Sequence, residues 1–481
     1  MIVTIETLPD HPLLEIFSLY VEEARGSSES HTAEQIDAWH TLVHVCQRWR
    51  SLVFASSRRL NLGILCTNTR PLKKILDLWP ALPIVTWCKG VLFAGLLPMP
   101  VVGAESIVSA LGHRDRVSQI SFSDLPLSIF FRFTAIMHAS FPMLTHLELD
   151  PGDDGEEAIL QDSFLGGSAP CLRSLRLRSV PFPFPVLHKL LLSANDLVEL
   201  RLLNIPLSGY VSPEGLASCL SSLSKLEDLR LGFPSHASYP DHHLQRPLTR
   251  VDLPHLIRLD FEGTSKYLEN FVARINAPLL RVFQMMFIGP VLLNTPQLTD
   301  FVDRAERFKV LDQAALDFDH CNVTINLLSQ KETVKRTILK VRCDCGPTEG
   351  RFSALAHARS SFLSLISSLE CLNLTQRKFW SLYLQNGVDN PDWLQLLRPF
   401  TAVKHLFLSG ELVLPVARAL HELSWEVVVG VCPALQSIFL EGLQPSEDVV
   451  KAIGPFIVRR QLSGHPVTVH SWEGKTLGID I

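Results

Sequence analysis

Residues 172–177 read LRSLRL, and the same arrangement of apolar residues returns as LVELRL at 197–202 and as LEDLRL at 226–231. The first, fourth and sixth positions of each segment hold a leucine. The last three positions alternate between apolar and charged residues, which is typical of a short β-strand with one buried face. Each segment therefore predicts one strand whose leucines enter a core.

This pattern recurs along most of the chain at intervals of 23 to 35 residues. The further copies are LTHLEL from Leu144, LIRLDF from Leu256, LRVFQM from Leu280, LECLNL from Leu369, VKHLFL from Val403 and LQSIFL from Leu435. VSQISF from Val117 and LPIVTW from Leu82 extend the series, and degenerate copies are QAALDF from Gln313 and RTILKV from Arg336. Such a period is typical of leucine-rich repeats, in which stacked units each supply one strand and one return segment.

The repeats predict an α/β fold for residues 63–481, namely an irregular leucine-rich-repeat solenoid with a parallel strand ladder on its concave face and a C-terminal cap. The return segments 186–196 and 213–225 have helical spacing of their apolar residues. The usual repeat has an asparagine three residues after its last apolar position. This chain has Gly152, Val180, Ile205, Pro234 and Thr264 there, so we expect no asparagine ladder and variable return segments.

The first 62 residues have a different character and predict a small all-α domain. The stretch AWHTLVHVCQRWRSLVF at 38–54 reads as a helix whose apolar arc spans roughly 200°, about twice what a one-sided surface helix needs. A second helix, expected from Asp10 to about Ala24, has a similar excess. The extra apolar surface either binds another protein or packs on the first repeats.

Leu8-Pro9 followed by LLEIF, and then LVHVCQRWRSLVF after the polar loop at 25–35, resembles the F-box motif over about residues 5–62. The continuation at 56–85 and the segment PFIVRRQLSGHPVTV at 455–469 resemble fungal F-box proteins with leucine-rich repeats. His11-Pro12 and the long loop depart from the compact motif. The resemblance implies docking on a Skp-family adaptor, and through it on a cullin scaffold, in an SCF-type ubiquitin ligase.

The resemblance also implies which residues face or support the adaptor-binding surface: Leu8, Pro9, Leu14, Ile16, Phe17, Val45, Cys46 and Trp49. Arg50 is expected to lay its stem on that surface and to give its charge to an acidic partner residue. The alternative is an interaction scaffold whose F-box-like helices only cap the repeat array. In both interpretations the chain performs no bond chemistry and is not an enzyme.

The residue between the last two apolar positions of each repeat points away from the core, so these residues form a column on the open face. The column includes Arg176, Arg201 and Arg230, which we expect to bind an acidic or phosphorylated segment of a client protein. It ends with Phe407 and Phe439, which could anchor an apolar client residue. The alternatives are a self-neutralising lattice with Glu199 and Asp228, and a C-terminal loop that caps the phenylalanines.

Composition excludes several classes of function. A net charge of −5 over 481 residues gives no field that would attract nucleic acid, and no apolar run is long enough to span a membrane. The 10 cysteines lack the spacing of a disulfide framework and no signal peptide is recognisable, so we expect a cytoplasmic or nuclear protein. Cys343 and Cys345 near His320 and Cys321, the histidines at 236, 242 and 243, and GKT at 474–476 match no metal or phosphate motif, so no cofactor is expected.

Overall fold

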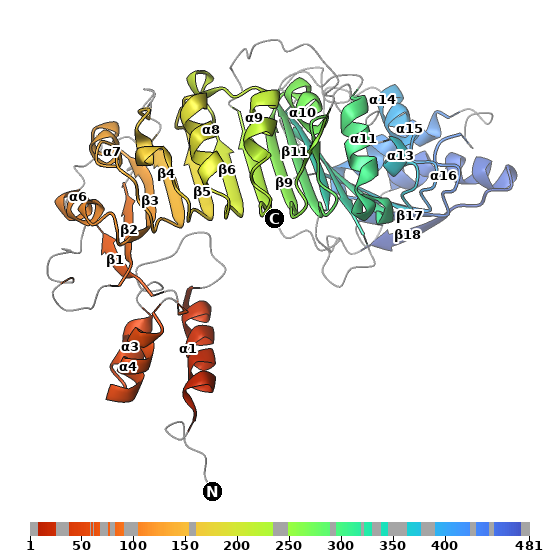
Figure 1. Cartoon of the computed structure of the whole chain (residues 1–481). Helices are drawn as coiled ribbons and strands as arrows, with labels where there is room; N and C mark the ends of the chain where they lie inside the picture. Colours follow the sequence, from red (N-terminus) through yellow and green to blue (C-terminus); the bar gives the residue numbers. More distant parts are fainter. Residues whose placement is uncertain are drawn as a thin grey trace, which may run out of the picture. The chain divides into compact units, whose positions relative to one another are not determined.

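The computed structural model describes residues 8–25, 38–57, 59–60, 62–67, 76, 82–90, 104–152, 160–233, 249–288, 295–318, 322–329, 338–344, 363–376, 390–423, 430–441 and 447–472. The chain divides into two compact units, Met1–Tyr210 and Val211–Ile481. In Figure 1 the first unit runs from red to yellow and the second from green to blue. Strands and helices alternate within each unit, as the repeat predicts.

Unit 1 begins with three helices, α1 at Asp10–Arg25, α3 at Trp39–Val43 and α4 at Gln47–Ala55. The prediction of one continuous helix over 38–54 is therefore wrong. Cys46 has an extended backbone with φ −158° and ψ 171°, which ends the helical path, and its Sγ accepts a hydrogen bond from the Trp49 backbone N–H at 3.5 Å. Cys46 thus caps α4, and the break falls between two segments that each have helical apolar spacing.

Unit 1 continues as a ladder of parallel strands that pair in chain order. The strands are β1 (Ile64–Thr67), β2 (Ile84–Lys89), β3 (Val117–Leu125), β4 (His146–Pro151), β5 (Ser174–Arg178) and β6 (Glu199–Leu203). The return segments hold α6 (Ala104–Gly112), α7 (Leu127–Thr134) and α8 (Phe184–Ser193), with 3₁₀ turns η2 (Phe164–Gly167) and η3 (Leu207–Gly209). The repeats from Leu82 to Leu197 are confirmed as strands.

The strands of unit 2 are hydrogen-bonded in the order β7-β9-β11-β14-β13-β12-β15-β16-β17-β18. These strands are β7 (Asp228–Gly232), β9 (Arg258–Gly263), β11 (Val282–Ile288), β14 (Leu339–Asp344), β13 (Asn322–Leu328), β12 (Gln313–Phe318), β15 (Cys371–Gln376), β16 (His405–Leu408), β17 (Ser437–Glu441) and β18 (Thr468–Trp472). A short parallel pair joins β8 (Val251–Asp252) to β10 (Ile275–Asn276).

The return segments of unit 2 are mostly helical and differ in length. They are α9 (Pro213–Leu220), α10 (Ser265–Val272), α11 (Pro296–Arg304), η4 (Glu306–Val310), α13 (Leu363–Ile366), α14 (Asn390–Leu397), η7 (Gly410–Leu412), α15 (Val413–His421) and α16 (Glu447–Leu462). Among the helices of the described residues, none is long and apolar enough to cross a membrane.

The expectation of a wholly parallel ladder is wrong at one strand. β13 runs antiparallel to both β12 and β14. Only residues 319–321 separate β12 from β13, and so short a connection can form a hairpin but not the crossover that parallel strands require. The hairpin returns the chain so that β14 pairs with β11 and β12 pairs with β15, both in parallel.

The core of each unit consists of rows of apolar residues from strands in register. In unit 2, Leu229 pairs with Leu259, which pairs with Phe283, and all three side chains are 0% exposed. Each side chain of such a row is covered from both sides by the neighbouring repeats. Burial therefore depends on stacking, as the sequence pattern predicts.

One buried carboxylate links two successive helices in unit 2. Glu269 of α10 is 1% exposed, and its oxygens accept hydrogen bonds from the backbone N–H groups of Gln297 and Leu298, at 2.7 and 2.9 Å. These N–H groups belong to the first turn of α11, where no intrahelical acceptor exists. Burial raises the pKa of Glu269, although the two backbone hydrogen bonds act in the opposite direction.

Replacement of Glu269 by alanine should lower the free energy of unfolding by about 1–3 kcal/mol, because two buried N–H groups would lose their acceptor. Urea denaturation measures this difference. The matched control is Glu262→Ala on β9, an exposed glutamate whose loss should cost less than about 0.5 kcal/mol. Equal unfolding midpoints for the two variants would contradict this role of Glu269.

Candidate functional site

The three N-terminal helices share a hydrophobic cluster with the first strand. Phe17, Trp39 and Val53 are 0% exposed, and the cluster also contains Leu60, Leu62, Ile64 and Leu82. The Trp39 indole N–H donates a hydrogen bond to the Gly63 carbonyl at 3.2 Å. Part of the excess apolar surface is therefore covered by this chain itself, and the domain boundary predicted after residue 62 lies inside this cluster.

A second apolar surface on these helices remains open among the described residues. It consists of Ile16, Leu19 and Tyr20 on α1, which are 42%, 65% and 39% exposed, and of Val45 between α3 and α4, which is 56% exposed. The three α1 residues follow i, i+3, i+4 spacing, so they lie on one side of the helix. We call these four residues the exposed apolar patch. Apolar residues grouped on one side of a helix, as Ile16, Leu19 and Tyr20 are, mark interaction surfaces more often than single ones.

The predicted adaptor-binding residues divide into two groups. Leu14 and Phe17 are 8% and 0% exposed and face the internal cluster, so they support the surface from below. Trp49 is half-buried, with its ring centroid 4.7 Å from that of Phe17. The remaining ones are accessible: Pro9, Ile16, Val45, Cys46 and Arg50 are exposed, and Leu8 is half-buried. Leu19 and Tyr20 were not predicted, although both belong to the apolar arc of the first helix.

Two arginines hold the helices in this arrangement. Arg48 of α4 donates hydrogen bonds to the Leu8 carbonyl at 2.6 Å and to Asp10 Oδ1 at 2.7 Å, which ties α4 to the beginning of α1. Arg50 Nε donates to the Val43 carbonyl at 2.9 Å, at the end of α3. This nitrogen of Arg50 is therefore used within the chain, whereas the side chain was expected to serve an outside partner.

The two arginines of the column in unit 1 share one glutamate. Arg176 and Arg201 are in register on β5 and β6, and Glu199 forms an ion pair with each of them. Ser174 Oγ also donates to Glu199 Oε2 at 2.6 Å. Burial raises the pKa of Glu199, but the hydrogen bonds from Ser174 and Arg176 and the two positive charges outweigh burial, so the net shift is downward.

Unit 2 pairs its arginines in the same way. Arg230 Nε lies 3.1 Å from Asp228 Oδ1 and 3.4 Å from Asp260 Oδ2, while Arg258 Nε lies 2.9 Å from the same Asp260 oxygen. Burial raises the pKa of Asp260, and the two arginines counter this only in part. The self-neutralising lattice thus describes the pairing of all three predicted arginines. Their binding of an acidic client stays a prediction.

The predicted aromatic pair does come together. Phe407 on β16 and Phe439 on β17 are register partners, and their rings stack with centroids 4.4 Å apart. Both side chains are half-buried on the face of the sheet opposite the buried leucines. Trp472 of β18 also contacts Phe407, with 5.4 Å between centroids, and was not predicted because β18 lies outside the repeat pattern.

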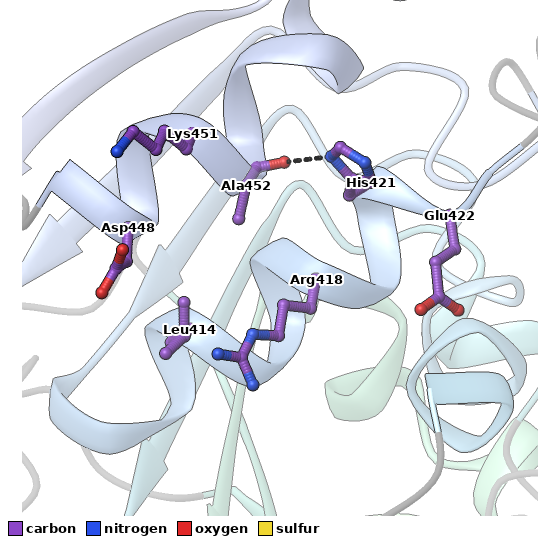
Figure 2. A pocket seen from close by; sticks show the side chains of 7 residues that line it. All are labelled: Leu414, Arg418, His421, Glu422, Asp448, Lys451 and Ala452. Carbon is purple, nitrogen blue, oxygen red and sulfur yellow. Dashed lines mark hydrogen bonds between the residues drawn. The ribbon is translucent and has the colours of Figure 1, made fainter.

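A polar pocket lies between α15 and α16, with a volume of about 380 Å³. As Figure 2 shows, Leu414, Arg418, His421 and Glu422 line it from α15 and its end, and Asp448, Lys451 and Ala452 from α16. His421 Nδ1 donates to the Ala452 carbonyl at 3.2 Å. Charges of both signs share the lining and only two side chains are apolar, which is unlike the mostly apolar pockets that hold small ligands.

The chemistry of metals and activated thiols gains no support from the described residues. Within them, no three His, Cys, Asp or Glu side chains gather at a distance suitable for a metal ion. Burial raises the pKa of Cys66 to about 12 and that of Cys88 to about 11, the opposite of an activated nucleophile. Cys345, His320 with Cys321, the histidines at 236, 242 and 243, and GKT at 474–476 lie outside the described residues.

Comparison with known proteins gives likeness in fold only. No family model matches the chain, and no curated protein matches it. The crystal structure of the leucine-rich repeat-containing protein LegL7 from Legionella pneumophila is similar, with 14% identity, 79% of this chain and 98% of that chain covered, and a TM-score of 0.27. A Bacteroides fragilis protein shows 9% identity, 92% and 84% coverage, and a TM-score of 0.20. These identities and TM-scores are too low to support an argument. The repeat architecture is therefore supported by the strands and helices described above.

Replacement of Glu199 by glutamine should lower the free energy of unfolding by about 1–3 kcal/mol near neutral pH, because two half-buried arginines would lose their counter-charge. The pKa of Glu199 is lowered in the folded state. The contribution of Glu199 to the free energy of unfolding is therefore fully present at a pH above the ordinary pKa of glutamate, and it is lost as the pH falls through the folded-state pKa.

Urea denaturation at pH 7 and at about pH 3 checks both statements. The difference between wild type and Glu199→Gln should shrink at the lower pH. Glu370→Gln, which removes an exposed ion pair with Lys404, should change stability by less than about 1 kcal/mol and serves as control. A Glu199→Gln effect that does not depend on pH would contradict the electrostatic account.

Proposed function

We propose that this chain is the client-recognition subunit of an SCF-type ubiquitin ligase. In this proposal the N-terminal helices dock on a Skp-family adaptor, and the open face of the repeats binds a protein client. The chain would act as a scaffold, because holding the client near the charged ubiquitin carrier raises the effective concentration of its lysines. The resemblance of residues 5–62 to the F-box motif of fungal proteins is the reason to name a Skp-family adaptor as the partner.

The observation that carries the proposal is the exposed apolar patch of Ile16, Leu19, Tyr20 and Val45. These helices already bury Phe17 and Trp39 in their own cluster, and among the described residues the patch is apolar surface that this packing leaves exposed. A helix that presents apolar residues at i, i+3 and i+4 spacing has the form that binds an apolar groove on another protein. Pro9 and Cys46 are accessible beside it and could extend the contact.

The rival function is an interaction scaffold that never meets an adaptor and uses the N-terminal helices only as a cap. Two observations favour a capping role in part, namely the shared cluster with Ile64 and Leu82 and the hydrogen bond from Trp39 to Gly63. Capping does not explain why Leu19 and Val45 are left 65% and 56% exposed. The two functions differ in one testable respect, which is complex formation with the adaptor.

The purified chain should form a complex with a purified Skp-family adaptor in size-exclusion chromatography at about 10 µM of each protein. Ile16→Asp and Val45→Asp should each weaken the complex about tenfold or more in calorimetric titration, because each buries an unpaired carboxylate in an apolar interface. Both positions are exposed in the free chain, so the unfolding midpoint should stay within about 2 °C of wild type.

The matched control is Val458→Asp on α16, which places the same charge on a helix at a valine that is 55% exposed. This variant should bind the adaptor as tightly as wild type. A wild-type chain that forms no complex, or a Val458→Asp effect as large as that of Val45→Asp, would favour the capping scaffold.

A further inference from the structure

Aromatic side chains of the three neighbouring strands β16, β17 and β18 form a row on the open face of unit 2. Strands β17 and β18 are labelled in Figure 1. Phe407 and Phe439 stack at 4.4 Å with 9° between their planes, and His470, the register partner of Phe439, stacks on it at 5.2 Å. Because Phe439 covers one face of Phe407 from the β17 side, the other face of Phe407 is turned toward β15.

Trp472 adds a second aromatic plane to this row. Its ring lies 5.4 Å from that of Phe407 at an interplanar angle of 71°, so the two rings form a corner. Ring faces carry the negative part of the aromatic quadrupole and attract cations, most strongly in tryptophan. The corner is thus suited to a positively charged group.

One exposed carboxylate neighbours the corner. Glu441 follows Phe439 by two residues on β17, is exposed, and pairs in register with Trp472. Its Oε2 lies near Gly410 of η7, which begins two residues after the end of β16. The segments of β15 to β18 contain no lysine or arginine, so no cation of these strands neutralises Glu441.

A buried hydrogen-bond acceptor lies beside the row. Asn373 of β15 is the register partner of Phe407 and is 1% exposed. Within the described part of the chain, its Oδ1 has no hydrogen-bond partner. A buried acceptor without a donor is unfavourable, by about 1–3 kcal/mol, so a donor that arrives with a ligand would relieve a cost that already exists.

We propose that this corner, formed by Phe407, Trp472, Glu441 and Asn373, binds an arginine side chain of a client protein. The inference rests on the proposed client-binding function of the repeats and names the chemistry of the client. A guanidinium group is planar, stacks on aromatic faces and donates several hydrogen bonds in one plane. It can therefore stack on the rings and donate to the Glu441 carboxylate and to Asn373 Oδ1.

Other client side chains would make fewer favourable contacts with these four residues. A lysine ammonium is a compact, strongly hydrated charge that does not stack, and an apolar side chain would leave Glu441 and Asn373 without donors. An acidic side chain would be repelled by Glu441. The client chemistry expected at this end is thus basic, in contrast to the acidic segment that the arginine column suggested.

The test is fluorescence polarisation with the purified full-length chain and fluorescein-labelled five-residue peptide pools. The central residue is arginine, citrulline, lysine or glutamate, and the flanking positions are random mixtures without basic residues. Citrulline keeps the shape of arginine but has no charge. The arginine pool should bind at least about fivefold more tightly than each of the other three pools.

Glu441→Gln should bring the affinity for the arginine pool down to that for the citrulline pool, and Trp472→Ala should weaken it about tenfold. Glu441 is exposed, so its substitution tests the site without loss of the fold. The matched control is Glu262→Gln, an exposed glutamate of β9 on the same face, which should leave binding unchanged. Equal binding of the arginine pool and the citrulline or lysine pool would overturn the assignment.

This outcome is separable from that of the ligase proposal. A chain that binds the adaptor but shows no preference for the arginine pool contradicts the arginine site alone. A chain that prefers the arginine pool but forms no adaptor complex supports the site and contradicts the ligase proposal.

Discussion

One strand with its return segment cannot bury its own apolar side chains, and the architecture follows from this constraint. Leu175 and Leu200 are 0% exposed and are in register on adjacent strands, so each depends on the neighbouring repeat for its cover. Because every leucine of the pattern points into the core, the residues between them are left on the opposite face. The arginines with their acidic partners, and the aromatic row in unit 2, lie on that opposite face of their own strands as a result.

The leucine spacing predicted the strands from β2 to β17 apart from β8, β10 and β13, because it shows which side of each strand is buried. It could not predict β13, whose position depends on a three-residue connection to β12 rather than on a repeat. The helix break at Cys46 was not predicted for a similar reason. Apolar spacing is helical on both sides of that residue, and only its extended backbone separates α3 from α4.

The exposed apolar surface, the ion pairs and the aromatic row were predicted in part. The wide apolar arcs indicated that the N-terminal helices have two apolar sides. Which side is buried depends on how the helices pack on one another and on the first strand. This packing buries Leu14 and leaves Leu19 exposed. The register of Arg176 with Arg201 agrees with the predicted column, while the geometry with which Glu199 pairs with both arginines required coordinates. Trp472 was missed because β18 lacks the repeat spacing, although it completes the aromatic corner with Phe407.

The central claim is that the N-terminal helices present surplus apolar surface to another protein while the repeats stay available for a client. Hydrogen–deuterium exchange of the chain, alone and mixed with a Skp-family adaptor, tests this claim most directly. The account predicts slower exchange of α1 and α4 in the mixture and unchanged exchange of the repeat strands β15 to β18. Unchanged exchange of α1 and α4, or protection confined to the repeats, would contradict it.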